Sequence, residues 1–429
     1  ILPLSLITGP AIPDLTITFS IIFLFFFLFY KKEIKELFKF NWFKYSIYFW
    51  IYLVISSLFG YNVYKSFPES LIFLRFLFIP LLIYFFIFNN ISKINYLFIT
   101  IFISVIFVIF DCLYQFFKYN SESGFGADIF GYIPDFAPFN RLTGPFKDLV
   151  PGAYISKFCF LGLVFLHLYI KKIEVKQSII ILYLAVCGYI TYISGERMAF
   201  ATFGLGLTIY VLLNRNFNRL ILSSTIILMF IFIAITYVFH PAYNDYIIKE
   251  SSSVELGLIV EKEFKCSEKS KEICTKKVNF QPSFISVINN FRESAYGEIY
   301  ALSFNMYKDN KIFGIGLNNF KYLCEDKEHY GKQLKNIKCV THPHNYYIQW
   351  LTETGPLGLI GFLFYLASII IYILKNNSNY ELKLISIIVF TILFWPIMST
   401  GSLTKNWLGV STFFILGIII FLHKINIKN

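Results

Sequence analysis

Charged side chains are scarce in this 429-residue sequence, because Asp, Glu, Lys and Arg together make up only 15% of it. Soluble globular proteins carry roughly 25%. Hydrophobic residues account for 56% of the sequence and aromatic residues for 20%, and the mean hydropathy is +0.61. The shortage of charge excludes an ordinary soluble enzyme and indicates a membrane protein.

Several common sequence signals are also absent. No Cys-x-x-Cys spacing occurs, which argues against a zinc site. The Gly314-x-Gly316 pair has no following glycine and no Walker lysine, so it predicts a tight loop and not a nucleotide site. No regular internal repeat is apparent, which argues against a transporter built from two related halves.

Apolar runs long enough to cross a hydrocarbon core of roughly 30 Å recur along the chain. We expect Ile1–Ile7 to be the tail of a further span and the sequence to be truncated at its N-terminus, because it does not begin with Met. The predicted fold is an all-α integral membrane protein of about 11–12 transmembrane helices. The eleven complete spans are 15–30, 42–59, 70–88, 94–117, 151–170, 177–193, 198–213, 220–239, 357–374, 382–399 and 406–423.

These spans and the loops between them divide the chain into five parts. Transmembrane helices occupy residues 1–117 and 151–239, and loops of residues 118–150 and 240–345 follow them. Residues 346–429 hold an interfacial helix and the last transmembrane helices. The larger loop contains 28 of the 64 charged residues, so we predict a hydrated subdomain and not a linker.

The formal net charge of +12 has one main source. Six short connections fall on the same side of the predicted membrane and hold 15 Lys and Arg against four Glu, a net +11. By the positive-inside rule this side is cytoplasmic, and the two long loops are periplasmic. Orientation therefore explains the basic balance without a nucleic-acid partner. The connections are 31–44, 89–93, 171–176, 214–219, 375–383 and 424–429.

The seven cysteines form two groups. Cys112, Cys159 and Cys187 lie in spans, where we expect inert apolar side chains. The other four lie in the large loop and allow two disulfides with three possible connectivities, or alternatively a zinc site. These four are Cys266, Cys274, Cys324 and Cys339.

Polar groups at the membrane edge are costly and are therefore candidates for function. The segment 341–356 begins with His342-Pro343-His344 and ends at Gly355-Pro356, which predicts a short helix at the outer interface. A histidine at its start can act as a general base toward a hydroxyl. The alternatives are a metal site that uses both histidines, or an interfacial stripe that contacts lipid headgroups or a neighbouring helix.

The same helix carries three polar residues at intervals of four, Asn345, Gln349 and Glu353, which places them on one face. Ser194-Gly195-Glu196-Arg197 lies at the outer end of another span. Arg197 either pairs with Glu196 alone or binds a phosphate through its forked guanidinium.

Two further segments carry cations near the outer face. Arg141 and Lys147 flank a Gly-Pro turn, which is either a phosphate clamp or a solvated turn at headgroup level. Arg292 lies near the start of the segment Phe291–Phe320, which also contains the Gly314-x-Gly316 loop.

In this order, the segments resemble the motifs of the O-antigen ligase and polymerase superfamily of polytopic bacterial membrane glycosyltransferases. The matching blocks are Arg141–Gly152, Ser194–Arg197, Lys311–Phe320 and His342–Gly361. The resemblance implies a GT-C-like helical membrane fold of about twelve spans. It also implies glycan transfer from undecaprenyl diphosphate to an acceptor hydroxyl, on lipid A core or a growing glycan, at the periplasmic face of the inner membrane. No nucleotide sugar, metal or other cofactor is implied.

By position, the resemblance assigns Arg197 to the donor diphosphate and His344 to the general base, with Asn345 and Glu353 organising the helix. Many members carry Ser-Gly-Arg where this sequence has Ser294-Ala295-Tyr296, and we expect Arg292 to substitute for that arginine. Arg141 is our own addition to the diphosphate site. A ligase is favoured over a polymerase by the His-Pro-His-Asn helix and the Ser-Gly-x-Arg block, and a transporter or flippase for lipid-linked sugars is a third alternative.

Overall fold

Apolar segments adopt helices here because a chain in hydrocarbon must satisfy every backbone hydrogen bond within itself. The computed structural model describes residues 2–88, 91–119, 125–133, 141–146, 150–215, 217–240, 260–264, 276–280, 288–326, 330–334, 338–376, 379–397 and 399–425. Within these ranges a helix coincides with each of the eleven predicted spans. They are α2 (Ala11–Tyr30), α3 (Asn41–Ser57), α4 (Val63–Ile83), α5 (Ile91–Phe117), α6 (Pro151–Tyr169), α7 (Ile173–Ile193), α8 (Arg197–Leu213), α9 (Arg219–Phe239), α14 (Tyr346–Lys375), α15 (Tyr380–Leu393) and α16 (Asn406–Phe421).

Among the described residues, eight of these helices are long and apolar enough to cross a membrane by themselves. The other three are α3 and α8, of 17 residues each, and α15, of 14 residues. Seventeen residues rise about 26 Å, slightly less than the hydrocarbon thickness. The prediction of an all-α multi-pass membrane protein is confirmed.

The helices on the outside of the bundle expose apolar side chains. On α2 and α9, many large apolar side chains are more than half exposed, among them Phe19, Phe26, Leu220, Phe230 and Phe239. Contiguous apolar surface of this kind is unfavourable in water and suits contact with lipid.

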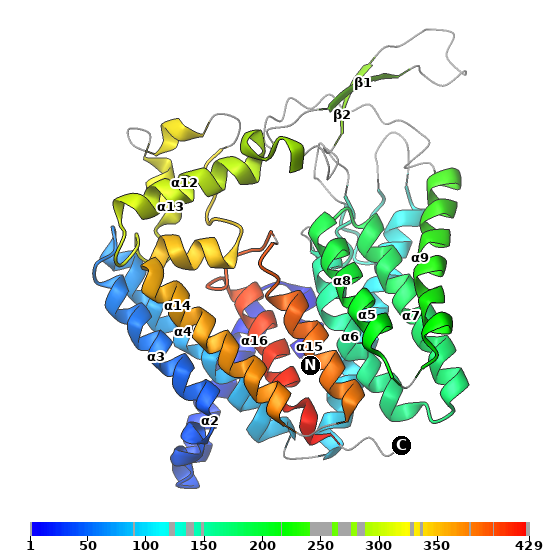
Figure 1. Cartoon of the computed structure of the whole chain (residues 1–429), viewed down its shortest axis with the longest axis horizontal. Coiled ribbons are helices and arrows are strands. Elements are labelled where there is room, and N and C mark those ends of the chain that lie inside the picture. The colour runs from blue at the N-terminus through cyan, green and yellow to red at the C-terminus, as the bar shows by residue number, and fades with distance from the viewer. Residues whose placement is uncertain are drawn as a thin grey trace.

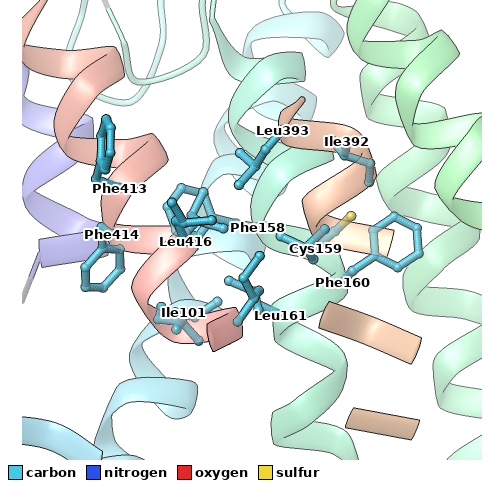
Figure 2. Packing of buried hydrophobic residues seen from close by; sticks show 14 of the residues in the cluster. Ile101, Phe158, Cys159, Phe160, Leu161, Ile392, Leu393, Phe413, Phe414 and Leu416 are labelled. Atoms are coloured by element: carbon cyan, nitrogen blue, oxygen red, sulfur yellow. The ribbon is translucent and has the colours of Figure 1, made fainter. Parts of the chain in front are cut away.

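The bundle has two sides that meet at a central core (Figure 1). On one side α3 packs against α4 and α14, and on the other α7 packs against α8 and α9. Buried side chains from α5, α6, α15 and α16 meet between them, among them Ile101, Phe158, Leu393 and Leu416 (Figure 2). The three cysteines predicted to be inert are buried free thiols.

Smaller elements lie at one end of the bundle (Figure 1). They include α12 (Ala295–Asp309), α13 (Phe320–Glu325) and an antiparallel pair, β1 (Val260–Phe264) and β2 (Lys276–Phe280), in which Val260 faces Phe280. A separate apolar cluster joins α12 to α13, and α12 packs against α14. The α8–α9 and α14–α15 connections, two of the lysine- or arginine-bearing ones, lie at the opposite end (Figure 1).

The remaining elements are short, of three to six residues each. They are α1 (Leu2–Ser5), η1 (Leu6–Thr8), η2 (Ile34–Lys39), the π-helical turn η3 (Tyr84–Phe88), η5 (Phe291–Glu293), η6 (Gly331–Gln333) and η7 (Leu422–Lys424).

Two local predictions are tested directly. The helix from Tyr346 breaks at Gly355, whose φ of 70° and ψ of −175° are not helical, so a short helix ends where the sequence places its end. Cys324 and Cys339 form a disulfide with a Cα–Cα distance of 5.6 Å. Cys266 and Cys274, the other predicted pair members, lie outside the described residues.

Candidate functional site

The loop that carries Arg141 is fixed by a glutamine on α5. Gln115 is fully buried, and its Oε1 accepts hydrogen bonds from the backbone N–H groups of Thr143 (2.9 Å) and Gly144 (3.0 Å). Its Nε2 donates to Thr143 Oγ1 at 3.1 Å. Leu142 is fully buried next to this contact. These contacts and the buried Leu142 hold the backbone directly after Arg141, and so help to place that residue.

Glu196 joins the α7–α8 turn to the start of α6. Its carboxylate oxygens accept from the backbone N–H groups of Gly152 (2.6 Å) and Ala153 (3.1 Å), which are among the unsatisfied donors of a helix N-terminus. Burial raises the pKa of the Glu196 carboxyl to about 7. The two backbone donors and Arg141 oppose this rise, because they favour the ionised form. The carboxylate therefore caps the N-terminus of α6. This role differs from a simple pair between Glu196 and Arg197, which was one alternative from the sequence.

The two arginines lie close together. Arg141 packs its side chain over Gly195, where a Cβ would lie 3.2 Å from Arg141 Cγ. Arg197, the first residue of α8, interacts repulsively with Arg141. Burial lowers the pKa of the Arg141 guanidinium, and Glu196 opposes that effect. Arg141 Nε is buried without a hydrogen-bond partner, and Lys157 on α6 adds a third cation within range of Glu196.

Two histidines lie on the adjacent segment. The His342 and His344 ring centroids are 4.2 Å apart, and a hydrogen bond of 2.8 Å joins His342 Nδ1 to Thr341 Oγ1. His342 Nε2 is buried without a hydrogen-bond partner. Burial lowers the pKa of His344 and, with the neighbouring His344 ring, lowers that of His342 to about 3. Both rings are therefore neutral near pH 7.

The backbone at His344 is held in an unusual conformation. Its φ of 57° lies in the left-handed region, which is rare for a residue with a side chain and costs about 1–3 kcal/mol. The His344 carbonyl accepts from the Thr400 N–H at 2.8 Å. Asn345 then caps α14, because its Oδ1 accepts from the N–H groups of Tyr347 and Ile348 while its Nδ2 donates to the Pro396 carbonyl at 2.8 Å.

The polar face predicted for this helix points into the protein. Gln349 Nε2 donates to Glu353 Oε2 (2.9 Å) and to Ser402 Oγ (2.7 Å), and both Gln349 and Glu353 are buried. The interpretation as a stripe facing lipid headgroups is wrong for these two residues. Gln349 therefore fastens the helix that follows the histidines to the α15–α16 loop, and Glu353 binds Gln349.

The Gly314-x-Gly316 loop also docks on this helix. Both glycines have positive φ, 70° and 91°. The N–H of Ile315 donates to the Thr352 carbonyl at 3.0 Å, and that of Gly316 to the Glu353 carbonyl at 2.8 Å. A Cβ on Gly314 would lie 2.5 Å from the Glu353 carbonyl carbon, so only glycine permits this approach. The loop supports the helix, as the sequence led us to expect of a tight loop.

Tyr296 of α12 connects the arginines with the histidines. Its phenol lies near both Arg141 and Arg197. Its ring centroid is 6.1 Å from that of His344, with the rings at 79°. Arg292 lies in the turn η5 before α12 and is exposed. The α12 residue that lies beside the two arginines is therefore a tyrosine. Lys147 lies outside the described residues.

A metal site would require more ligands than the two histidines. Within the ranges that the structure describes, no three His, Cys, Asp or Glu side chains gather in a way that could hold a metal ion. Metal-independent chemistry remains a prediction from the sequence.

Comparison with known protein families decides the relationship. The O-antigen ligase family matches residues 179–363, which include the Arg197 turn, the Gly314-x-Gly316 loop and both histidines. Residues 179–363 are therefore similar to the O-antigen ligase family. A search of curated protein sequences found no match. The match over this region favours a glycosyltransferase-like membrane enzyme.

Several residues of this site were not singled out from the sequence. Besides Tyr296 and Lys157, they come from the α15–α16 loop, where Ser399, Thr400 and Ser402 contact the histidine helix or Tyr296. One sequence feature could have indicated this loop, because the segment 399–404 holds four Ser and Thr between two apolar spans. Arg141 is brought to the site although it lies outside the region that the O-antigen ligase family matches.

Proposed function

We propose that this protein transfers a glycan from undecaprenyl diphosphate to an acceptor hydroxyl at the periplasmic face of the inner membrane, and that it is a ligase whose acceptor is lipid A core. The observation that carries the proposal is the meeting of an arginine pair and a neutral histidine pair at one end of the bundle. Undecaprenyl diphosphate is a good leaving group, so the reaction chiefly needs cations for the leaving charge and a base for the hydroxyl.

In this proposal Arg141 and Arg197 bind the donor diphosphate. Guanidinium groups stay protonated at any relevant pH and match phosphate oxygens in pairs. The mutual repulsion of the two arginines and the buried Arg141 Nε without a partner support a site that awaits an anion. Arg292, which is exposed at the start of α12, is a further candidate for the outer phosphate.

His344 is the proposed general base. The acceptor oxygen attacks the anomeric carbon of the donor glycan, and the bond from that carbon to the phosphate oxygen breaks. His344 takes the hydroxyl proton, and undecaprenyl diphosphate leaves as the anion. The pKa of His344 is lowered, so the ring is unprotonated and ready to accept near neutral pH.

The proposed orientation follows from the two ends of the bundle. Lysine- and arginine-bearing connections lie at the end opposite α12, which supports a cytoplasmic location for them and a periplasmic one for the site (Figure 1).

The decisive experiment is the lipopolysaccharide profile of a deletion strain. A ligase predicts bare core with glycan accumulated on the lipid carrier, restored by the wild-type gene and not by a His344→Ala gene. Core that carries a single repeat unit would instead identify a polymerase, and a normal profile would contradict both assignments.

A further inference from the structure

Tyr296 lies where the two halves of the proposed site meet. Its side chain is within electrostatic range of both guanidiniums, and its ring stands nearly perpendicular to that of His344 at 6.1 Å. A donor diphosphate bound between Arg141 and Arg197, with its sugar toward His344, would pass this phenol.

The structure fixes the position of Tyr296 from the backbone upward. Ser294 caps α12, because its Oγ accepts from the Gly297 N–H at 3.1 Å. A Cβ on Gly297 would lie within 3 Å of the Phe291 and Arg292 backbone, so the preceding turn packs directly on the helix. Since α12 also packs against α14, it is held against the helix that follows the two histidines.

The hydroxyl is oriented as well. Ser399 Oγ donates a hydrogen bond of 2.8 Å to Tyr296 Oη. A phenol has one proton to donate, and an oxygen that already accepts from serine still has that proton for another acceptor. Ser399 comes from the α15–α16 loop, the same loop that binds the His344 carbonyl through Thr400.

We propose that Tyr296 is a third ligand of the leaving diphosphate, donating its hydroxyl proton to a phosphate oxygen beside Arg141 and Arg197 while Ser399 holds the phenol oxygen in place. This assignment rests on the function proposed above. In this assignment the diphosphate site consists of two cationic side chains and one neutral hydrogen-bond donor. The hydrogen bond strengthens as charge develops on the departing phosphate, so it contributes to kcat as well as to donor affinity.

The test uses the purified full-length protein in nanodiscs, with farnesyl diphosphate as the probe for binding and a lipid-linked glycan for turnover. Tyr296→Phe keeps the ring beside His344 and removes only the hydroxyl. We expect a roughly tenfold to hundredfold weaker Kd for farnesyl diphosphate and a similar fall in kcat/KM, the range for a hydrogen bond to a charged group. Ser399→Ala leaves the phenol unoriented and gives a smaller loss of the same kind.

Two variants separate this role from packing. Tyr307→Phe, on the same helix and outside the site, leaves both Kd and kcat/KM unchanged. Tyr296→Arg replaces the neutral donor with a charged one, so farnesyl diphosphate binding recovers at least to the wild-type level and becomes more sensitive to salt. A tyrosine that only packs against His344 would not be rescued by arginine.

The outcomes distinguish the two proposals. If wild-type protein does not bind farnesyl diphosphate, the diphosphate site itself is wrong. If wild-type binds it and Tyr296→Phe binds it equally well with unchanged turnover, the diphosphate site stands and the assignment of Tyr296 is overturned. Should Tyr296→Phe fold poorly, an unchanged Kd in Ser399→Ala overturns the assignment in its place.

Discussion

Buried polar groups gather at both ends of the helical bundle, and α8 spans the distance between them. At its first residue, Arg197 lies near a second arginine of like charge. After its last residue, Asn214 donates to Glu381 Oε2 at 3.1 Å, and His167 Nε2 lies 3.9 Å from the same oxygen. One end brings like charges together, while the other gives a buried carboxylate a donor. Glu196 offsets part of the repulsion at the first end, and in the proposed function a bound diphosphate offsets the rest.

Replacing His344 is expected to give the largest effect, and it acts at the end of the bundle where α12 lies. His344→Ala removes the proposed base, so glycan transfer falls by roughly 10²- to 10⁴-fold while farnesyl diphosphate binding remains. The measurement is turnover of a lipid-linked glycan alongside the binding assay. Wild-type turnover in this variant refutes the base assignment.

Replacing Arg197 tests whether the like charges are kept for a ligand. Arg197→Gln weakens farnesyl diphosphate binding by roughly tenfold to hundredfold, because a charge-assisted contact is lost. It also relieves the repulsion of Arg141, so the Tm of the ligand-free protein does not fall. A lower Tm with intact binding would show that Arg197 is structural.

Removing the disulfide loosens the histidine segment from α13. The cross-link closes a loop of 15 residues, and a closure of that size stabilises by about 3 kcal/mol. We expect Cys324→Ser to lower the stability of the α12–α13 region, seen as faster hydrogen exchange there and not near Glu381. Free thiols at both positions in mass analysis without reductant would contradict the pairing.

Replacing Asn214 tests the opposite end. Asn214→Ala removes a donor to the buried Glu381 carboxylate and the acceptor of the Phe217 N–H, so stability falls by about 1–3 kcal/mol. Turnover at a temperature where the variant is folded stays at the wild-type level. A loss of turnover without a change in Tm would show that the two ends are coupled.

The smallest effect is on the pH profile. The proposed base works only when neutral, and the pKa of His344 is lowered from its ordinary 6.5. Activity therefore persists as the pH falls through 6.5 and declines only at lower pH. The measurement is kcat/KM on both sides of that value, with Asn214→Ala as the matched variant. An acid limb at or above pH 6.5 contradicts the neutral, buried histidine.

Sequence patterns captured the helices because a membrane span must be apolar over its whole length and must satisfy its own backbone. They captured the end of the histidine helix for a similar local reason, since Gly355-Pro356 cannot continue a helix. The disulfide was open among three connectivities, because pairing depends on which loop segments approach in space.

The site was harder to assemble from the sequence. Arg197 and His344 stood out as polar groups at the membrane edge. Tyr296 did not, because one aromatic residue among 87 gives no signal until α12 is placed against α14. The α15–α16 loop was missed because Ser and Thr are ordinary loop residues, and only the contact with Gln349 and His344 shows their role. For Gln349 and Glu353, periodicity gave the shared face correctly, and tertiary packing decided that the face points inward.

The cap that Glu196 places on α6 makes the position of Arg197 depend on helix packing. The turn that carries Arg197 is attached through one carboxylate to the first N–H groups of a helix other than its own. Gln115 of α5 holds the loop of Arg141. The spacing of the two arginines therefore depends on how α5, α6, α7 and α8 pack together, and not on the loops alone. A detergent that lets these helices drift apart would separate the arginines while leaving every helix formed, so activity would vanish with the circular dichroism spectrum intact.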